Sequence, residues 1–263
     1  MNELIYNSIG TNYNTNRSAD TRIINIIQDL LDLPIASTIA DIGAGTGNYS
    51  NAFADIGYKV KAVEPSEEMR NQAKANNNVT WLSGTAESIP LPDNSVNGVI
   101  IVLAIHHFSS LQEASAEMRR ICPNGPLVLF TLDPREGEEP WFKNYFPEIY
   151  ERDFKSFPPI ETVCDIIGMN GEWTSEIKPF PLPDNLSDKN MYSAWNEPER
   201  YFDAQFRQNT SGLATASENV VEADLDKLKH DLETGIWDKK YGYLRTQKEF
   251  EAGFMFVKIS KRK

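Results

Sequence analysis

A glycine-rich segment near the start of the sequence has the residue types of a nucleoside-binding turn. The residues from Asp41 to Gly47 read Asp-Ile-Gly-Ala-Gly-Thr-Gly and overlap a short apolar run, Thr38 to Ile42. Glycine lets a backbone turn tightly and approach a ligand more closely than a residue with a Cβ atom permits. Glu64 ends the second expected strand, Lys59 to Glu64, where a carboxylate can accept hydrogen bonds from both ribose hydroxyls. Together these features predict a nucleoside site.

The spacing of the glycines distinguishes two classes of nucleoside cofactor. A dinucleotide-binding turn has the pattern G-x-G-x-x-G, in which the third glycine packs beside the helix. Here the pattern is G-x-G-x-G, and Asn48 and Tyr49 lie where that third glycine is expected. A cofactor without a pyrophosphate does not need a helix N-terminus exposed for phosphate binding. The sequence therefore favours a nucleoside cofactor that lacks a pyrophosphate.

Two adjacent histidines supply the candidate catalytic groups. His106 and His107 follow the apolar run Gly98 to Ile105, which suits a central strand buried on both faces. Open α/β sheets bind ligands at the carboxyl ends of their strands, and histidine titrates near neutral pH. Either ring can take a proton from a hydroxyl or amine acceptor, or the pair can shape the pocket floor. The third histidine, His230, is distant in the chain, so no metal site is expected.

The elements around these residues alternate between strand and helix patterns, as a parallel sheet with crossover helices requires. We expect helices at residues 18–32, 48–55, 66–73 and 111–122. The expected strands are 38–42, 59–64, 79–82, 98–105, 127–132 and 250–260. The order predicts a doubly wound α/β sheet.

The composition changes beyond Asp133, with helical patterns near residues 159–168, 188–207 and 217–234. We expect residues 1–133 to form a cofactor-binding core with an N-terminal cap segment. We expect residues 134–249 to form a lid, and residues 250–263 to return a final strand to the sheet before a basic tail. Most aromatic rings of the lid are expected in its core, and any that face the cofactor would line an apolar pocket. These rings are Trp141, Phe142, Tyr145, Phe146, Tyr150, Phe154, Phe157, Trp173, Trp195, Tyr201, Phe202, Phe206 and Trp237.

Charge and cysteine content exclude several classes of protein. The formal net charge of −12 at pH 7 repels phosphate backbones, so nucleic acid is not an expected substrate. Cys122 and Cys164 are isolated, which argues against a zinc site or a disulfide framework and fits a reducing cytosol. No apolar run approaches the roughly 20 residues of a membrane span, and the polar start of the chain is not a signal peptide. We therefore expect a cytoplasmic protein.

The motifs between residues 36 and 132 resemble, in order, those of class I methyltransferases. The likeness is closest to the broad type 11 branch, which includes quinone-biosynthesis and small-molecule enzymes. The matching segments are 41–47, Glu64-Pro65-Ser66 with Met69, Gly84 to Glu87, Ile89 to Ser95, and Val102 to His107. The resemblance implies a Rossmann-like, mostly parallel, seven-stranded sheet with a helical, aromatic-rich lid insertion. It also implies that S-adenosylmethionine is the cofactor and S-adenosylhomocysteine the product.

The resemblance further implies a role for individual residues. Gly43 and Gly45 would lie against the methionine and ribose, and Glu64 would bind the ribose diol. Ala86 would donate its backbone N–H to adenine, and Leu103 would contact the cofactor near the sulfonium. The remaining cofactor contacts implied are Asp41, Ala44, Pro65, Met69, Thr85, Glu87 and Ala104. Thr85 departs from the family, which commonly has an acidic residue there; a hydroxyl can still accept a hydrogen bond from the adenine amino group.

The N-terminal stretch contains two further candidates for cofactor binding. Related enzymes often fold a segment over the cofactor before the first helix. Tyr13 is a candidate to cover the sulfonium and Arg17 to bind the methionine carboxylate. The alternative is an exposed aromatic arm.

Methyl transfer from a sulfonium is an in-line displacement whose leaving group needs no protonation. Positioning can therefore supply most of the catalysis, and a base is needed only if the acceptor must lose a proton. We expect a small-molecule acceptor, apolar or aromatic, methylated at oxygen, nitrogen or carbon. Two other classes stay open: a non-catalytic S-adenosylmethionine-binding module and a nicotinamide-dependent oxidoreductase.

Overall fold

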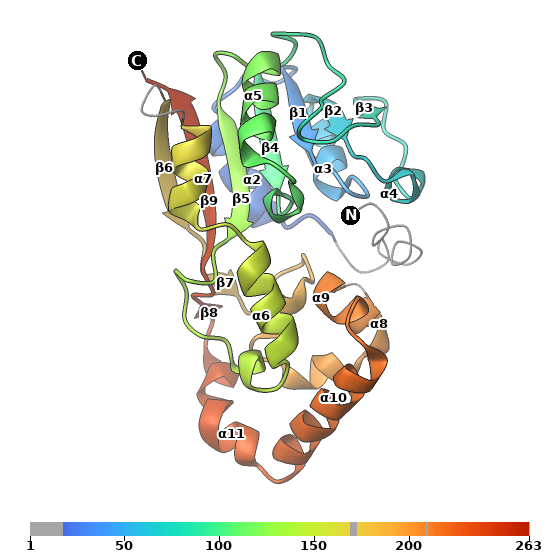
Figure 1. Ribbon diagram of the computed structural model, residues 1–263, viewed down its shortest axis with the longest axis vertical. Helices are drawn as coiled ribbons and strands as arrows, with labels where there is room; N and C mark the ends of the chain where they lie inside the picture. The colour runs from blue at the N-terminus through green and yellow to red at the C-terminus, as the bar shows by residue number, and fades with distance from the viewer. Residues whose placement is uncertain (1–17, 169–172, 209, 263) are drawn as a thin grey trace.

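A single seven-stranded sheet forms the centre of the computed structural model, which describes residues 18–168, 173–208 and 210–262. The strand order is β3-β2-β1-β4-β5-β9-β6 (Figure 1). The parallel strands are β1 (Thr38–Ile42), β2 (Lys59–Val63), β3 (Val79–Leu82), β4 (Gly98–Val102) and β5 (Leu127–Leu132). β9 (Phe254–Lys261) runs antiparallel to both of its neighbours, β5 and β6 (Trp173–Pro179). The predicted doubly wound, mostly parallel, seven-stranded sheet is confirmed.

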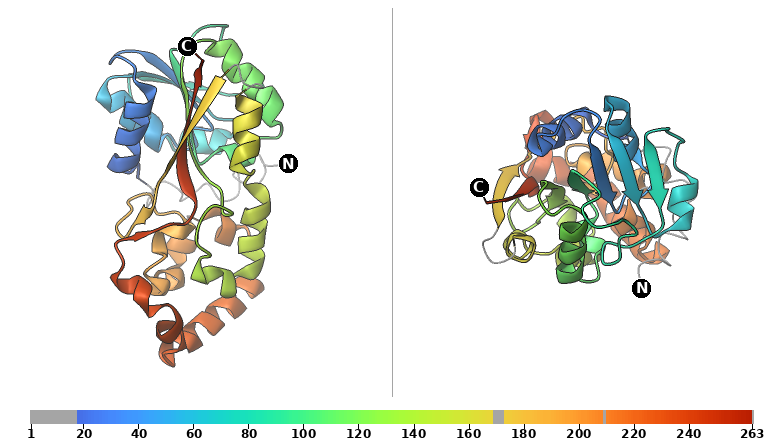
Figure 2. Two further views of the ribbon diagram at one scale, coloured as in Figure 1. Left: turned by 90° about the vertical axis from the view of Figure 1, so that its left-hand side faces the viewer. Right: turned by 90° about the horizontal axis from the view of Figure 1, so that it is seen from above.

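Helices cover both faces of this sheet (Figure 2). One face carries α2 (Thr21–Leu31) and α3 (Asn48–Ile56), and the other carries α5 (Leu111–Ile121) and α7 (Ile160–Ile167). The apolar stripe of α2 explains its place, because Ile23, Ile27 and Leu31 recur every fourth residue and are buried. Its first turn is capped by Asp20, whose side chain accepts a hydrogen bond from the backbone N–H of Arg22 at 3.0 Å.

The middle strands are buried on both faces, as their uninterrupted apolar sequences predict. All residues of β5 are buried, and so are the first four residues of β4. The carboxyl ends of the parallel strands point towards a second region of the molecule, below the sheet in Figure 1. A short helix, α4 (Glu67–Asn71), follows β2 at this edge. The loops that leave the strands therefore lie between the sheet and that second region.

The second region, here called the helical region, comprises residues 134–159 and 180–253. Its helical elements are η3 (Trp141–Asn144), α6 (Pro147–Ser156), η5 (Met191–Ala194), η6 (Pro198–Phe202), α8 (Ala204–Gln208), α9 (Ser211–Ala214), α10 (Glu218–Glu233), α11 (Ile236–Tyr241) and η7 (Gly242–Thr246). A two-stranded sheet joins β7 (Leu182–Pro183) to β8 (Glu249–Phe250). Two elements inside the range 134–249, α7 and β6, belong instead to the sheet half, since α7 packs on α5 and β6 pairs with β9.

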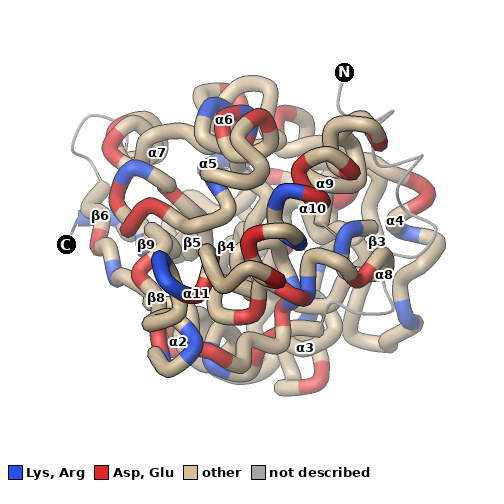
Figure 3. The backbone as a smooth tube through the Cα atoms, turned by 90° about the horizontal axis from the view of Figure 1, so that it is seen from below, with Lys and Arg blue, Asp and Glu red and all other residues tan. Residues whose placement is uncertain are grey.

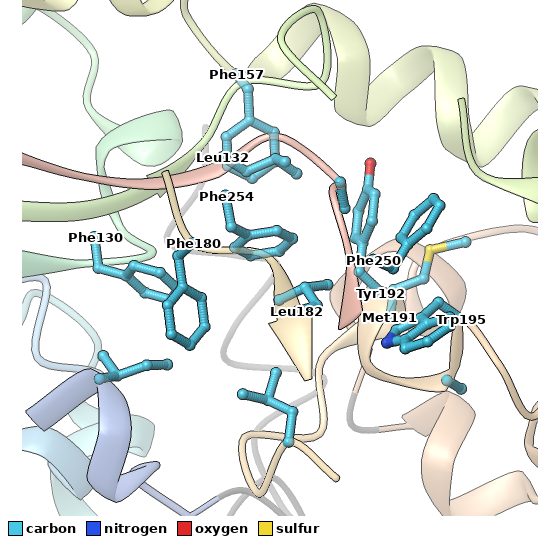
Figure 4. Close-up of a cluster of buried hydrophobic side chains, with 14 of the residues drawn as sticks. Phe130, Leu132, Phe157, Phe180, Leu182, Met191, Tyr192, Trp195, Phe250 and Phe254 are labelled. Atoms are coloured by element: carbon cyan, nitrogen blue, oxygen red, sulfur yellow. The ribbon is translucent and has the colours of Figure 1, made fainter. Parts of the chain in front are cut away.

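Aromatic side chains fill the interior of the helical region. The ring of Trp141 makes edge-to-face contacts with four others, and its indole N–H donates to the carbonyl of Trp195 at 2.7 Å. Phe130, Phe180 and Phe254 pack together where this interior meets the sheet (Figure 4). The buried cluster continues from there to α2 and α3, so the two halves share one core. Most of the rings assigned to a lid core are buried, whereas Phe202 is 37% exposed and Trp173 lies in β6.

Acidic and basic positions are interspersed over the surface of the helical region (Figure 3). Cys122 and Cys164 are both free thiols. Of the helices in the described part of the chain, none has the length and apolar character that crossing a membrane requires.

Candidate functional site

A cavity of about 400 Å³ lies at the carboxyl ends of the parallel strands. Its walls come from the loops that follow β1, β2, β3 and β4, and from one segment of the helical region. Most residues predicted to bind a cofactor meet there. These are Gly43, Ala44, Gly45, Glu64, Pro65, Met69, Thr85, Ala86, Glu87, Leu103 and Ala104, and His107 lines the same cavity.

The glycine turn is shaped by left-handed backbone conformations. Gly43, Gly45 and Gly47 have φ angles of +76°, +57° and +80°. A Cβ atom on Gly43 would lie 2.5 Å from the Cβ of Ala104, so this turn can approach β4 only with glycine at position 43. A Cβ on Gly45 would meet no atom within 4 Å. Because Gly45 lines the cavity, a side chain there would occupy space that a ligand can use.

Glu64 holds its carboxylate in the cavity wall. It is 8% exposed, and one oxygen accepts from the backbone N–H of Gly45 while the other accepts from that of Ser66, both at 2.9 Å. Burial raises the pKa of this carboxyl, and the two backbone hydrogen bonds oppose the rise. Each carboxylate oxygen has a second lone pair, so both can still accept from a ligand. The group is thus a fixed acceptor for a diol.

Apolar residues stand beside this carboxylate. Met69 is 3% exposed and is placed by α4, whose N-cap Ser66 accepts from the Met69 N–H at 3.3 Å. Ala86 is 5% exposed and follows β3. Glu87 ties this loop to the start of α5, since its carboxylate accepts from the N–H of Ser109 at 2.6 Å. The cavity wall that holds Glu64 therefore also presents the apolar residues Met69 and Ala86.

Asp41 supports the turn from behind. It is 2% exposed, is not among the lining residues, and accepts a hydrogen bond from the Ser50 hydroxyl at 2.5 Å. Burial raises its pKa to about 7, the Ser50 hydrogen bond acts against that rise, and the charge of Glu64 adds to it. The structure therefore gives Asp41 no direct contact with the cavity.

The two histidines are placed differently. They form the 3-10 helix η2 (Ile105–His107) after β4, with their rings 3.8 Å apart. His107 lines the cavity, and burial lowers its pKa to about 4, so its ring is neutral near pH 7. His106 is not among the lining residues, and its ring lies 4.1 Å from that of Phe157 in the helical region. Only His107 therefore faces the cavity directly.

Two predicted residues fall outside the structure, and several lining residues were not predicted. Tyr13 and Arg17 lie outside the described residues. Proximity to the glycine motif could have indicated Asn48 and Tyr49. No sequence signal indicates Asp188, which lines the cavity from the helical region. Other unpredicted lining residues are Ser18, Thr46, Ser66, Gly84, Val102, Phe108 and Ser109.

Known proteins share both the motifs and the fold. Residues 40–130 match the family model of the methyltransferase domain. A crystal structure of a putative methyltransferase from an antibiotic biosynthesis pathway of Anabaena variabilis is 43% identical, with a TM-score of 0.90 over 93% of this chain and 99% of that one. A demethylmenaquinone methyltransferase of Paenarthrobacter aurescens is 30% identical over 72% of this chain and 71% of its own length. An uncharacterized methyltransferase of Mycobacterium tuberculosis is 33% identical over 60% of this chain, and the match spans 66% of that relative, just under two thirds.

The cavity at the carboxyl ends of a doubly wound sheet, together with the matches to known methyltransferases, identifies the class of protein as the class I S-adenosylmethionine-dependent methyltransferases. The chain belongs to this methyltransferase family. The resemblance drawn from its motifs is thereby confirmed.

The residues in the cavity fit that cofactor. Gly45 borders open space that a Cβ would enter, and the buried Glu64 carboxylate stands ready to accept from ribose hydroxyls. Met69 and Ala86 supply the apolar surface that an adenine ring requires.

Proposed function

We propose that this protein transfers a methyl group from S-adenosylmethionine to an oxygen, nitrogen or carbon atom of a small molecule. The observation that carries the proposal is the Glu64 carboxylate, fixed in the cavity wall by the N–H groups of Gly45 and Ser66. When bound, S-adenosylmethionine supplies an activated methyl group on its sulfonium.

The chain's own residues act mainly by positioning. Glu64 holds the ribose, while Met69 and Ala86 hold the adenine. Leu103 is fixed at the end of β4 by a hydrogen bond from its N–H to the carbonyl of Phe130 at 2.8 Å. Holding acceptor and methyl group in line at this edge turns a two-body reaction into a reaction within one complex.

His107 orients the acceptor in this proposal. A ring with a pKa of about 4 is neutral near pH 7 and accepts a hydrogen bond, but it is a weak base. His106 supports it by packing between His107 and Phe157.

The acceptor we propose is a small apolar or aromatic molecule. The helical region beyond His106 is rich in buried rings, and this region, without α7 and β6, acts as a lid over the carboxyl edge of the sheet. The Paenarthrobacter relative is named as a demethylmenaquinone methyltransferase, and demethylmenaquinone is a small molecule. Tyr13 and Arg17 remain proposed cofactor contacts.

Calorimetric titration with S-adenosylhomocysteine tests the cofactor assignment. We expect micromolar binding that falls at least about tenfold in Glu64→Ala, because a ribose hydrogen-bonded to a charged acceptor loses that partner. Glu67→Ala is the matched control, since Glu67 is exposed on α4 and does not line the cavity. Absence of binding to the unaltered protein, or equal affinities for both variants, would reject the assignment, and tighter binding of NADH would favour an oxidoreductase.

A further inference from the structure

Asp188 comes from the helical region but lines the nucleoside cavity. It lies between β7 and η5 and is only 2% exposed. The rest of the described cavity wall comes from the sheet half, from Ser18 to Ser109. Asp188 is therefore the point at which the helical region contributes a charged group to the cavity.

The segment around Asp188 is held in one position. Ser187 donates two hydrogen bonds to the carboxylate of Asp20, from its backbone N–H at 3.0 Å and its hydroxyl at 2.9 Å. Asn190 donates its N–H to the carbonyl of Asp188 at 2.8 Å and caps η5 by accepting from the N–H of Tyr192 at 2.9 Å. These bonds anchor the backbone on both sides of residue 188.

The side chain of Asp188 is also oriented. The hydroxyl of Tyr49 donates to one of its carboxylate oxygens at 3.2 Å. Tyr49 lies in the first turn of α3, two residues after Gly47. The carboxylate is thus linked directly to the helix that begins at the glycine turn.

The position of Asp188 along the cavity identifies what it faces. Glu64, Met69 and Ala86 follow β2 and β3 and form the adenosine end of the cavity. Tyr49 and Asp188 stand at the start of α3, which follows β1. Since β1 lies between β2 and β4 in the sheet, Asp188 is displaced from the adenosine end towards the end where the reacting group must lie.

We propose that Asp188 binds the α-ammonium group on the methionine portion of S-adenosylmethionine. An ammonium group has three donors and no acceptor, and its hydrogen bonds to a carboxylate are strong because both partners are charged. The inference rests on the proposed function, because it takes the cavity to hold this cofactor. Its consequence is that the cofactor joins the two halves of the molecule, with Glu64 in the sheet half and Asp188 in the helical region.

Two ligands that differ by the amino-acid portion, which carries the ammonium group, test this proposal. S-adenosylhomocysteine carries the amino-acid portion, whereas 5′-methylthioadenosine has the same nucleoside thioether without it. Both are titrated calorimetrically into the unaltered protein and into Asp188→Asn, which keeps the shape and removes the charge. Asp184→Asn is the matched control, because Asp184 lies on the same segment, pairs with the exposed Lys248 and does not line the cavity.

We expect Asp188→Asn to weaken S-adenosylhomocysteine binding by roughly tenfold or more and to change 5′-methylthioadenosine binding by less than about twofold. Tyr49→Phe, which removes the orienting hydroxyl, should weaken S-adenosylhomocysteine alone by about two- to fivefold. Asp184→Asn should change neither affinity. Thermal melting of each variant checks that it is folded.

Three outcomes overturn the proposal. An equal loss for both ligands in folded Asp188→Asn would mean that Asp188 acts through the shape of the cavity. An unchanged affinity for S-adenosylhomocysteine would mean that Asp188 does not contact the cofactor and that its charge faces the methyl acceptor or stabilises the fold. A matching loss in Asp184→Asn would assign the effect to the segment rather than to the carboxylate. Failure of the proposed function is distinguishable, because the unaltered protein would then bind neither ligand.

Discussion

The sheet half and the helical region build their interiors in different ways. In the sheet half, alternating strands and helices bury branched aliphatic residues, and each of the parallel strands β1 to β5 ends at the same carboxyl edge. In the helical region, short helices pack around a few large rings such as Trp141, Tyr201 and Trp237. The first arrangement creates a cavity from loops close together in sequence. The second brings together residues that are distant in sequence.

The two halves also differ in how they position the residues of the candidate site. The glycine turn, Glu64 and the loop after β3 obtain their geometry from one another and from the loop after β4, all within the sheet half. Asp188 obtains its place only because the helical region packs against the sheet half. Nevertheless, the two halves share one continuous buried cluster, so we expect them to unfold together.

Replacing Trp141 by alanine tests whether the halves are one unit and should have the largest effect. The side chain is 1% exposed and its removal leaves a large cavity among four rings, so we expect a loss of about 3–5 kcal/mol in unfolding free energy. Urea unfolding followed by far-UV circular dichroism and by tryptophan fluorescence should give one shared midpoint. Phe202→Ala, at a 37% exposed ring, is the milder control. Two separate transitions would show that the halves unfold independently.

Replacing Gly45 by valine tests whether cofactor binding resides in the sheet half. Valine at φ +57° costs about 1–2 kcal/mol of strain and places its side chain in the cavity, so S-adenosylhomocysteine binding should fall by roughly 100-fold or more. Gly235→Val is the control, because Gly235 has φ +73° and equally open surroundings at the start of α11. The two variants should lose similar stability and differ in binding. Similar binding losses in both would contradict a local site.

A smaller effect is expected on stability from the ionisation of His107, which lies at the junction of the two halves. Because burial lowers its folded-state pKa from 6.5 to about 4, its ring should stay neutral from pH 8 down to about 5. In NMR titrations, the imidazole signal assigned by its loss in His107→Gln should not move over this interval. Stability from this residue should be lost as the pH falls below 6.5, where only the unfolded state gains the proton. A midpoint near 6.5 in the folded protein would instead support a role in proton transfer.

Most of the sheet half could be predicted from the sequence, because its strand patterns and glycine motif each lie within a short segment. Strands β4 and β5 are nearly continuous apolar runs, β1, β2 and β3 are short segments rich in strand-forming residues, and the glycine turn marks its own position. The residues of the candidate site that follow these strands therefore lie at one edge, as parallel strands require. Asp41 departs from this pattern, because its side chain points to Ser50 behind the turn.

The remaining features depend on contacts between distant segments. β6 is an edge strand in which only Trp173 is buried, and its sequence, Trp-Thr-Ser-Glu-Ile-Lys-Pro, lacks the apolar run of a central strand. The partner of β6 is β9, and Trp173 lies opposite Lys261. Asp188 similarly gains its role from Tyr49, 139 residues earlier in the chain. Neither the pairing of β6 with β9 nor the contact of Asp188 with Tyr49 produces a periodic pattern in the sequence.

The position of β9 between β5 and β6 sets an order for assembly of the sheet. β6 precedes β9 in the chain by more than seventy residues but pairs with the sheet only through it. The segment from residue 173 to residue 179 must therefore wait, with the outer edge of β5 unpaired, until residues 254–261 arrive. Closing such long loops is slow, and an exposed strand edge invites pairing with other chains. Until residues 254–261 are inserted, the outer edge of β5 is therefore open to pairing with other chains.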